Sequence, residues 1–129
     1  MKKIIYTKNA PNPIGPYNQA IVNNGILYTS GQIAIDINSG KLVAASIEDE
    51  TKLVMQHLSE ILKSANSDFS EVIKVSIFIK NMNDFAKINA IYARYFDEEN
   101  APARETIEVA RLPKDANIEI SLIANAKLE

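Results

Sequence analysis

Two charged side chains stand among apolar residues in the last quarter of the chain. Residues 101–126 alternate as two apolar strands joined by a short loop of proline, aspartate and asparagine, with Arg104 early in the first strand and Glu119 early in the second. Because Ile118 and Ile120 flank Glu119, its carboxylate is predicted to face away from the aliphatic side. If the two strands pair, the short loop keeps Arg104 and Glu119 close together.

This pair of charges has two interpretations. A guanidinium binds a carboxylate through two parallel hydrogen bonds, and a nearby glutamate can act as a general base. Arg104 and Glu119 could therefore hold a carboxylate substrate and move a proton beside it. Alternatively, the two side chains form a cross-strand ion pair, which contributes little to stability. The spacing alone leaves both interpretations open.

Composition excludes several classes of protein. The 129 residues are 47% hydrophobic and 23% charged, as expected for one globular domain over residues 1–129. The net charge of −2 and the lack of a basic run disfavour a nucleic-acid partner. There is no cysteine and one histidine, His57, so cysteine chemistry is absent and no metal site is expected. We expect no cofactor of any kind.

The N-terminal residues show no targeting signal. No apolar run approaches the length of a membrane span, and Lys8, Asn9 and Pro11 soon follow the short apolar stretch at residues 4–6. The sequence therefore predicts a soluble cytoplasmic protein without a membrane partner.

The first third of the chain is predicted to form a strand and a hairpin. A strand at residues 4–7 precedes a stiff loop at 11–19, which holds three of the five prolines and positions Tyr17. The apolar runs 20–22 and 26–35 flank an Asn-Gly turn, which predicts the hairpin.

Ser30 and Gly31 interrupt the second strand of this hairpin. Glycine inside a strand commonly marks a bulge or a close approach of another group to the backbone. The Gly31 N–H and the Ser30 hydroxyl could also bind an anion, and both interpretations fit the sequence.

The middle of the chain predicts two helices separated by a strand. Ser46 is placed to cap a helix over residues 47–65, on which His57 lies beside the apolar stripe and is expected to be partly exposed. A second helix is predicted to begin at Asn83 and to run to about Phe96. Between the helices, residues 72–80 form a strand whose apolar face is predicted to carry Ile73, Val75, Ile77 and Ile79.

This order predicts an α+β fold with a single mixed sheet of about six strands and two helices packed on one face. Two helices cannot cover both faces of such a sheet. The uncovered face carries Phe78 and other apolar side chains among polar ones, so a homo-oligomer is expected to bury it. Functional sites would then lie between subunits.

Several short motifs resemble one known family. They are Asn9-Ala10-Pro11, Ile14-Gly15-Pro16-Tyr17, Thr29-Ser30-Gly31-Gln32, Asn83-Asp84-Phe85 with Asn89, Pro102-Ala103-Arg104, the run from Val109 to Asp115, and Ile118-Glu119-Ile120. Together they resemble the reactive intermediate (imine) deaminase A family, also called RidA or YjgF, over essentially the whole chain.

The resemblance implies a chorismate-mutase-like (YjgF) fold assembled as a homotrimer, with a central β-barrel and three clefts between subunits. It implies that Arg104 binds the substrate carboxylate and that Glu119 positions or activates a water. It also implies that Tyr17 closes the pocket from the neighbouring chain. The other positions implied to bind substrate or line the cleft are Ser30, Gly31, Asn89, Thr106 and Pro113.

The activity implied by the resemblance is that of a 2-iminobutanoate/2-iminopropanoate deaminase. Such enzymes hydrolyse the enamines and imines released by pyridoxal-phosphate enzymes to 2-keto acids and ammonia. The alternative is a module that binds or senses small carboxylates such as 2-keto acids without turnover. RNA cleavage, attributed to some relatives, is disfavoured by the lack of a basic surface and of a histidine pair.

The chain departs from the family pattern beside the arginine. Glu105 replaces a residue that is usually small, and strand alternation is expected to point it away from Arg104. Thr106 stands where many members carry a cysteine, so thiol-dependent behaviour is not expected here.

Overall fold

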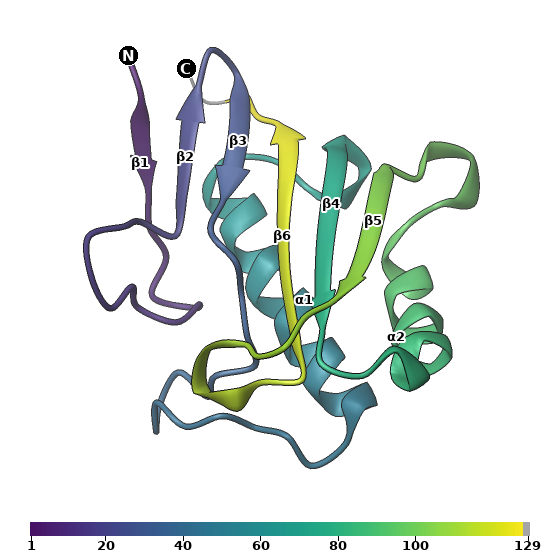
Figure 1. Ribbon diagram of the computed structural model, residues 1–129. Coiled ribbons are helices and arrows are strands. Elements are labelled where there is room, and N and C mark those ends of the chain that lie inside the picture. The colour runs from purple at the N-terminus through teal and green to yellow at the C-terminus, as the bar shows by residue number, and fades with distance from the viewer. Residues whose placement is uncertain (128–129) are drawn as a thin grey trace.

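The computed structural model of this chain describes residues 1–127. Its centre is a six-stranded sheet in the order β1-β2-β3-β6-β4-β5, in which β4 and β5 are parallel and all other neighbours are antiparallel (Figure 1). The strands are β1 (Lys3–Ile5), β2 (Ala20–Asn23), β3 (Ile26–Thr29), β4 (Val72–Ile79), β5 (Ala103–Glu108) and β6 (Ile118–Asn125). The α-helices are α1 (Ile47–Ser64) and α2 (Phe85–Tyr92).

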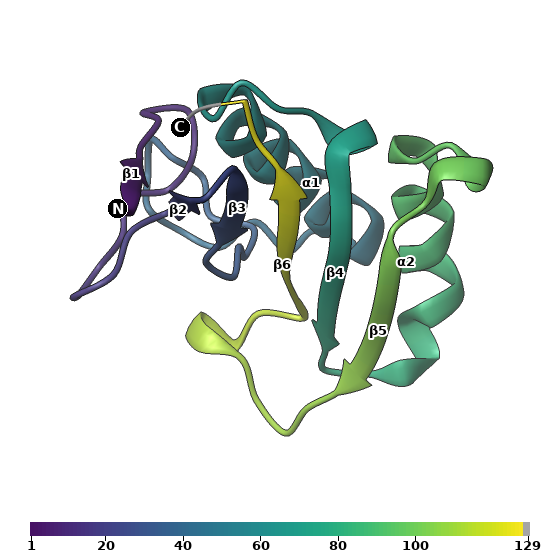
Figure 2. The ribbon, with the colours of Figure 1, turned by 90° about the horizontal axis from the view of Figure 1, so that it is seen from above.

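Both helices lie on the same face of the sheet, as the view from above shows (Figure 2). The core lies between the sheet and α1. Alternating aliphatic side chains of β4 and β6 point toward α1 and pack on its apolar stripe, which removes both surfaces from water. The opposite face has no helix over it. The expected mixed sheet with two helices on one face is therefore confirmed.

The last two strands do not pair, because β4 lies between β5 and β6. The chain passes from β4 through α2 into β5, and this helical crossover places β5 parallel to β4. The other side of β4 pairs with β6, so Arg104 lies beside Val75 and Glu119 beside Phe78. The two charged residues thus lie on different sides of a central strand.

The first hairpin forms around the predicted turn. Asn24 and Gly25 have φ angles of 53° and 76°, as a type I′ turn requires. Its second strand ends at Thr29, however, and does not run to Ile35. Beyond it, Gln32 forms an isolated bridge with Ile120.

The first helix begins as predicted, since the Ser46 side chain accepts a hydrogen bond from the Asp49 N–H. The expectation that His57 is partly exposed is wrong, because its side chain is only 2% exposed. Its Nε2–H donates to the carbonyl oxygen of Ile35 at 2.8 Å. The segment after β3 folds over this part of α1, which the helical periodicity could not indicate.

Two features in the middle of the chain also differ from the prediction: the exposure of Ile73 and the residue that caps the second helix. Ile73 is exposed, because the register of β4 shifts between Val72 and Lys74 and turns this residue out of the core. Asn83 does not cap α2; the Asn81 side chain instead accepts from the Asn83 N–H and caps a short 3₁₀ turn before the helix.

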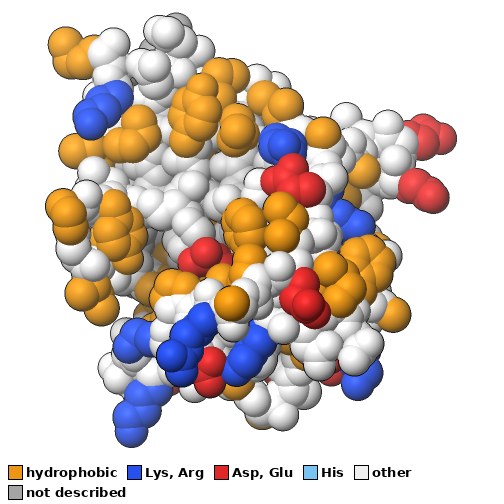
Figure 3. All heavy atoms as spheres, viewed as in Figure 1, with side chains coloured by type: hydrophobic (Ala, Val, Ile, Leu, Met, Phe, Trp, Pro, Cys, Tyr) orange, Lys and Arg blue, Asp and Glu red, His pale blue; other side chains and the backbone are white. Residues whose placement is uncertain are grey.

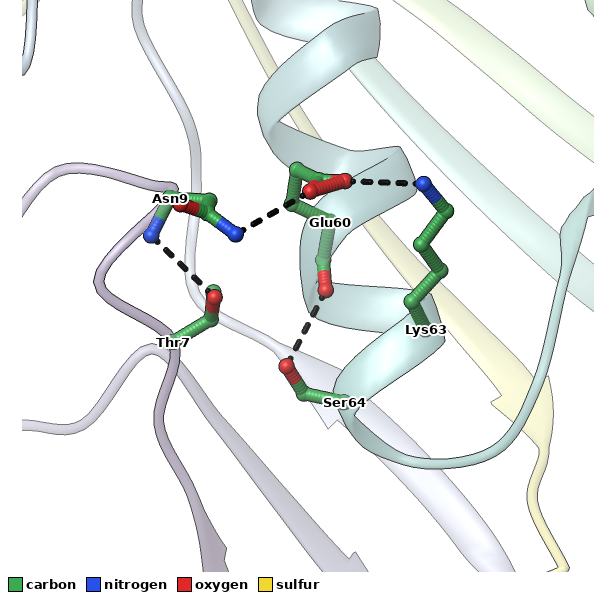
Figure 4. Close-up of polar contacts among 5 residues, drawn as sticks. All are labelled: Thr7, Asn9, Glu60, Lys63 and Ser64. Carbon is green, nitrogen blue, oxygen red and sulfur yellow. Dashed lines mark hydrogen bonds and ion pairs between the residues drawn. The ribbon is translucent and has the colours of Figure 1, made fainter.

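The loop after β1 is attached to the C-terminal half of α1 (Figure 4). Asn9 Nδ2 donates to Glu60 Oε1 at 3.3 Å, and the second oxygen of Glu60 lies 3.2 Å from Lys63 Nζ. Thr7 Oγ1 accepts from the Asn9 N–H at 3.1 Å. These contacts fix the start of the proline-rich loop that leads to Tyr17.

Neither α-helix within residues 1–127 has the length and apolar composition of a membrane-spanning segment.

The buried histidine predicts a pH dependence of stability. Burial lowers the pKa of His57 below its ordinary value of 6.5. As pH falls below 6.5, the unfolded chain takes up this proton before the folded chain does, so the folded state loses stability until the pH passes the folded pKa. Each unit of depression corresponds to about 1.4 kcal/mol.

We therefore expect the free energy of unfolding, measured by urea denaturation at constant ionic strength, to fall between pH 7 and pH 5. The fall should be smaller in His57→Gln, whose side-chain amide can still donate to the Ile35 carbonyl. Equal slopes in both proteins would show that His57 does not cause the loss.

Candidate active site

A hollow of about 370 Å³ opens beside the loop that carries Tyr17. Three segments contribute to its wall: the N-terminal proline-rich loop, the segment after β3 and the loop before β6. The lining residues that matter for the site are Tyr17, Gly31, Ile33, Ile37, Pro113 and Lys114. Aliphatic side chains and one phenol ring, with polar groups that include Asp36 and Lys114, thus surround a space large enough for a small organic acid.

The Tyr17 ring is positioned by the buried side chain of Gln19. Gln19 Nε2 donates to the carbonyl oxygens of Thr7 and Pro11, at 2.9 and 3.0 Å, and Oε1 accepts from the Thr7 N–H. The Tyr17 hydroxyl accepts from the Ile14 N–H at 3.3 Å, while the ring remains 50% exposed. The loop is therefore fixed internally, and the ring faces outward where a ligand or another chain can meet it.

Glu119 is packed directly against the backbone of Gly31. A Cβ atom at Gly31 would lie 2.7 Å from the carboxyl carbon of Glu119, so only glycine allows this approach. The predicted interruption of the strand is thus a close approach by a carboxylate side chain. Ser30 does not contribute a free hydroxyl, because its Oγ donates to the Asn18 carbonyl.

Burial raises the pKa of Glu119 above its ordinary value. Within residues 1–127, no lysine or arginine forms an ion pair with it. A carboxylate that is partly removed from water and lacks a cation binds a proton more readily than an exposed one. Glu119 therefore has a property expected of a general base, a carboxylate whose affinity for a proton is increased by burial.

The start of β6 is held by a second glutamate that sequence reasoning did not find. Glu50 is fully buried near the N-terminus of α1, and its two oxygens accept from the backbone N–H of Asn117 at 2.8 Å and from its Nδ2 at 2.7 Å. The Asn117 carbonyl in turn accepts from the Lys80 N–H at 3.0 Å. This clamp fixes the backbone two residues before Glu119.

Arg104 lies elsewhere, at the edge strand β5 and against α2. Its Nη1 donates to Asn89 Oδ1 at 2.8 Å, and its guanidinium carbon lies 4.8 Å from the centroid of the Tyr92 ring. Within residues 1–127, it forms no ion pair with a carboxylate. The alternative of a cross-strand ion pair with Glu119 is therefore wrong.

The two residues after Arg104 point to opposite faces of the sheet. Glu105 faces away from α2, as predicted, and accepts from Ser76 Oγ and from Lys74 Nζ at 2.8 Å. These hydrogen bonds hold the pKa of Glu105 below its ordinary value. Thr106 lies on the same face as Arg104, and its buried hydroxyl has no partner within residues 1–127. Because Glu105 points away from Arg104 and pairs with Lys74, its carboxylate does not face the guanidinium.

The predicted site residues therefore form two separate groups. Tyr17, Gly31 and Pro113 line the hollow, and Glu119 packs beside Gly31. The other group comprises Arg104, Asn89 and Thr106 at the β5 edge. Arg104 and Glu119 are separated by two strand spacings of about 4.8 Å and three residues of about 3.3 Å, or roughly 14 Å between Cα atoms, and their side chains point to opposite faces.

Comparison with known proteins identifies the family. Residues 7–126 match the family described as Endoribonuclease L-PSP. The chain is 42% identical over 124 residues to the human protein named 2-iminobutanoate/2-iminopropanoate deaminase, covering 96% of this chain and 90% of the human one. This chain belongs to that family, which is also known as RidA/YjgF.

Solved structures of Rid-family proteins share this fold. A Rid-family protein of Yersinia pestis, YyfA, superposes with a TM-score of 0.94 at 47% identity, covering 98% of this chain and 100% of the other. Escherichia coli TdcF with bound serine superposes with a TM-score of 0.89 at 39% identity, covering 97% and 99% of the two chains.

The contact between Gly31 and Glu119 predicts how this Rid-family chain responds to an added methyl group. Gly31→Ala should displace the Glu119 carboxylate, and we expect activity on an imino acid to fall by about ten-fold or more. Because the new methyl group would overlap Cγ and the carboxyl group of Glu119, the free energy of unfolding should fall by about 1–3 kcal/mol.

A double-mutant cycle with Glu119→Ala measures this coupling. In the Glu119→Ala background, Gly31→Ala should cause no further loss of activity, because the carboxylate that the methyl group displaces is absent. If Gly31→Ala instead reduced activity equally in both backgrounds, the contact with Glu119 would not be the reason for the loss.

Proposed function

We propose that this chain is a 2-iminobutanoate/2-iminopropanoate deaminase, which hydrolyses 2-imino acids and their enamine tautomers to 2-keto acids and ammonia. The observation that carries the proposal is Arg104, a guanidinium held in place by Asn89 and two aromatic rings, with no carboxylate partner among residues 1–127. The name of the human relative supports the reaction. The serine bound to TdcF supports a small amino-acid-like ligand.

The proposed site lies between two copies of the chain. Arg104 and Glu119 point to opposite faces of the sheet, so the Arg104 group of one copy is proposed to meet the Tyr17 and Glu119 group of another. We further propose a homotrimer that buries the helix-free faces of its three sheets in a central barrel. That face carries exposed hydrophobic side chains among charged ones (Figure 3), including Ile4, Tyr28 and Ile107.

The proposed reaction needs orientation, a water molecule and proton transfer, and no nucleophile from the protein. Arg104 holds the substrate carboxylate by two parallel hydrogen bonds and so fixes the adjacent C=N carbon. Glu119 accepts a proton from a water, whose oxygen bonds to that carbon as the electron pair of the C=N bond moves to nitrogen. That proton is then delivered to nitrogen, which gives a carbinolamine. Glu119 next takes the hydroxyl proton and passes it to the amino group, so the C–N bond breaks, ammonia leaves and the carbonyl of the keto acid forms.

An alternative function uses only the carboxylate-binding part of this chemistry and not the hydrolysis. A protein that binds 2-keto acids as a sensor needs Arg104 but not Glu119. The raised pKa of Glu119 favours turnover, because binding of an anion does not require a buried base.

RNA cleavage, which the family description names, lacks comparable support. His57 is the single histidine, and it is buried with its Nε2–H donated to a backbone carbonyl. The net charge of −2 also provides no general attraction for the phosphate backbone of RNA.

Arg104 variants test the proposed substrate contact. An amino acid oxidase generates the imine of alanine in solution, semicarbazide traps what remains, and the fall in trapped imine measures hydrolysis. Arg104→Ala should lose about 100-fold or more in kcat/KM, because a charge-assisted two-point contact is removed. Arg104→Lys should recover only part of this, since an ammonium cannot form the planar fork. Equal imine loss with wild type and Arg104→Ala would refute the proposal.

A mixing experiment tests whether the site is shared between chains. Arg104→Ala and Glu119→Gln should each retain only weak activity alone. Unfolding and refolding them together should raise the activity, because some mixed sites then combine the intact Arg104 of one chain with the intact Glu119 of another. Separate refolding of each variant is the control. Recovery no greater than in the control would place both residues of a working site in one chain.

A further inference from the structure

Three residues on one face of α2 surround the Arg104 guanidinium. Phe85, Asn89 and Tyr92 are spaced at i, i+4 and i+7, so their side chains form one stripe facing β5. The guanidinium carbon lies 5.7 Å from the centroid of the Phe85 ring and 4.8 Å from that of Tyr92. Sequence periodicity places both rings on the inward face, but does not show that a cation covers them.

The contacts on this stripe leave most of the guanidinium available. Asn89 Oδ1 accepts from Nη1 at 2.8 Å, and the two rings supply favourable cation–π contacts within about 6 Å without using an N–H donor. Since arginine has five N–H donors, four are left for a ligand. A flexible side chain held in this way loses less conformational entropy when a carboxylate binds.

Tyr92 is the more firmly held of the two rings. Its side chain is 6% exposed, and its ring centroid lies 4.7 Å from that of Phe96, which lies 5.3 Å from Phe69. Burial raises the pKa of Tyr92 to about 12, so the phenol stays neutral and does not neutralise the nearby cation. Its hydroxyl has no hydrogen-bond partner within residues 1–127. The nearby Arg104 charge partly opposes the rise in the pKa of this hydroxyl, but the contact with Arg104 that the geometry shows is made by the ring face.

We propose that Tyr92 and Phe85 are positioning residues that hold the Arg104 guanidinium in the orientation required for two-point binding of the substrate carboxylate. Tyr92 forms the base of this support and Phe85, which is 38% exposed, forms its rim. This inference rests on the proposed function, because it assumes that Arg104 binds the carboxylate.

Substitution of the Tyr92 ring separates positioning from general packing. In Tyr92→Leu, we expect KM for the imino acid and the inhibition constant of pyruvate to rise about ten-fold, while kcat changes less than two-fold. Tyr92→Phe should restore both constants, because the ring returns and the hydroxyl forms no hydrogen bond within residues 1–127. Tyr95→Leu is the matched control, since Tyr95 packs on Phe69 at 5.3 Å in the same aromatic cluster, whereas the rings that Arg104 covers within residues 1–127 are Phe85 and Tyr92.

Each outcome of this comparison decides the inference. If Tyr92→Leu and Tyr95→Leu have the same KM while Arg104→Ala raises it, the positioning role is refuted and the proposed function stands. If Arg104→Ala leaves KM and pyruvate inhibition unchanged, the proposed function fails and the inference fails with it. If Tyr92→Leu does not fold, Phe85→Leu, at the more exposed ring, takes its place. A rise in KM of about three-fold in Phe85→Leu supports the positioning role, and an unchanged KM refutes it.

Discussion

The position of β4 between β5 and β6 is the constraint on which the rest of the structure depends. Its buried residues pair with β6 on one side and with β5 on the other. This arrangement separates Arg104 from Glu119 by a whole strand and turns their side chains to opposite faces. A cation and an anion that would neutralise each other on neighbouring strands are thus kept apart, and each stays available for another partner.

Each charged group has a local support that is not another charge. Arg104 lies on two aromatic rings and bonds to the Asn89 amide. Glu119 lies over the bare backbone of Gly31, where partial burial raises its pKa. A partly buried carboxylate with a raised pKa, such as Glu119, is typical of functional sites. The proposed assembly would bring the two groups together and place the substrate between them.

Local features were predictable from the sequence where a local interaction determines them. The Asn24-Gly25 turn and the Ser46 cap follow from backbone preferences of a few residues, and the outward direction of Glu119 follows from strand alternation. Strand order was not predictable in this way, because the pairing of β4 with both final strands depends on how α2 packs. His57 and Glu50 are buried by segments distant in sequence, which no helical pattern reveals. The exposure of Ile73 results from a shift in register between two strands.

The candidate site was predictable residue by residue but not in its arrangement. The motifs around Tyr17, Gly31, Arg104 and Glu119 indicated these side chains as site candidates through family resemblance. Their division into two groups appears only in three dimensions. The aromatic contacts of Arg104 were hidden because an inward-facing ring in a helix ordinarily indicates a core residue.

A crystal structure with bound 2-oxobutanoate, the keto acid product, tests the central claim most directly. The account predicts that the ligand carboxylate contacts Arg104 of one chain while Glu119 and Tyr17 of a neighbouring chain contact the same ligand. A ligand held entirely by one chain, or a complex in which Arg104 makes no contact with the carboxylate, would contradict it.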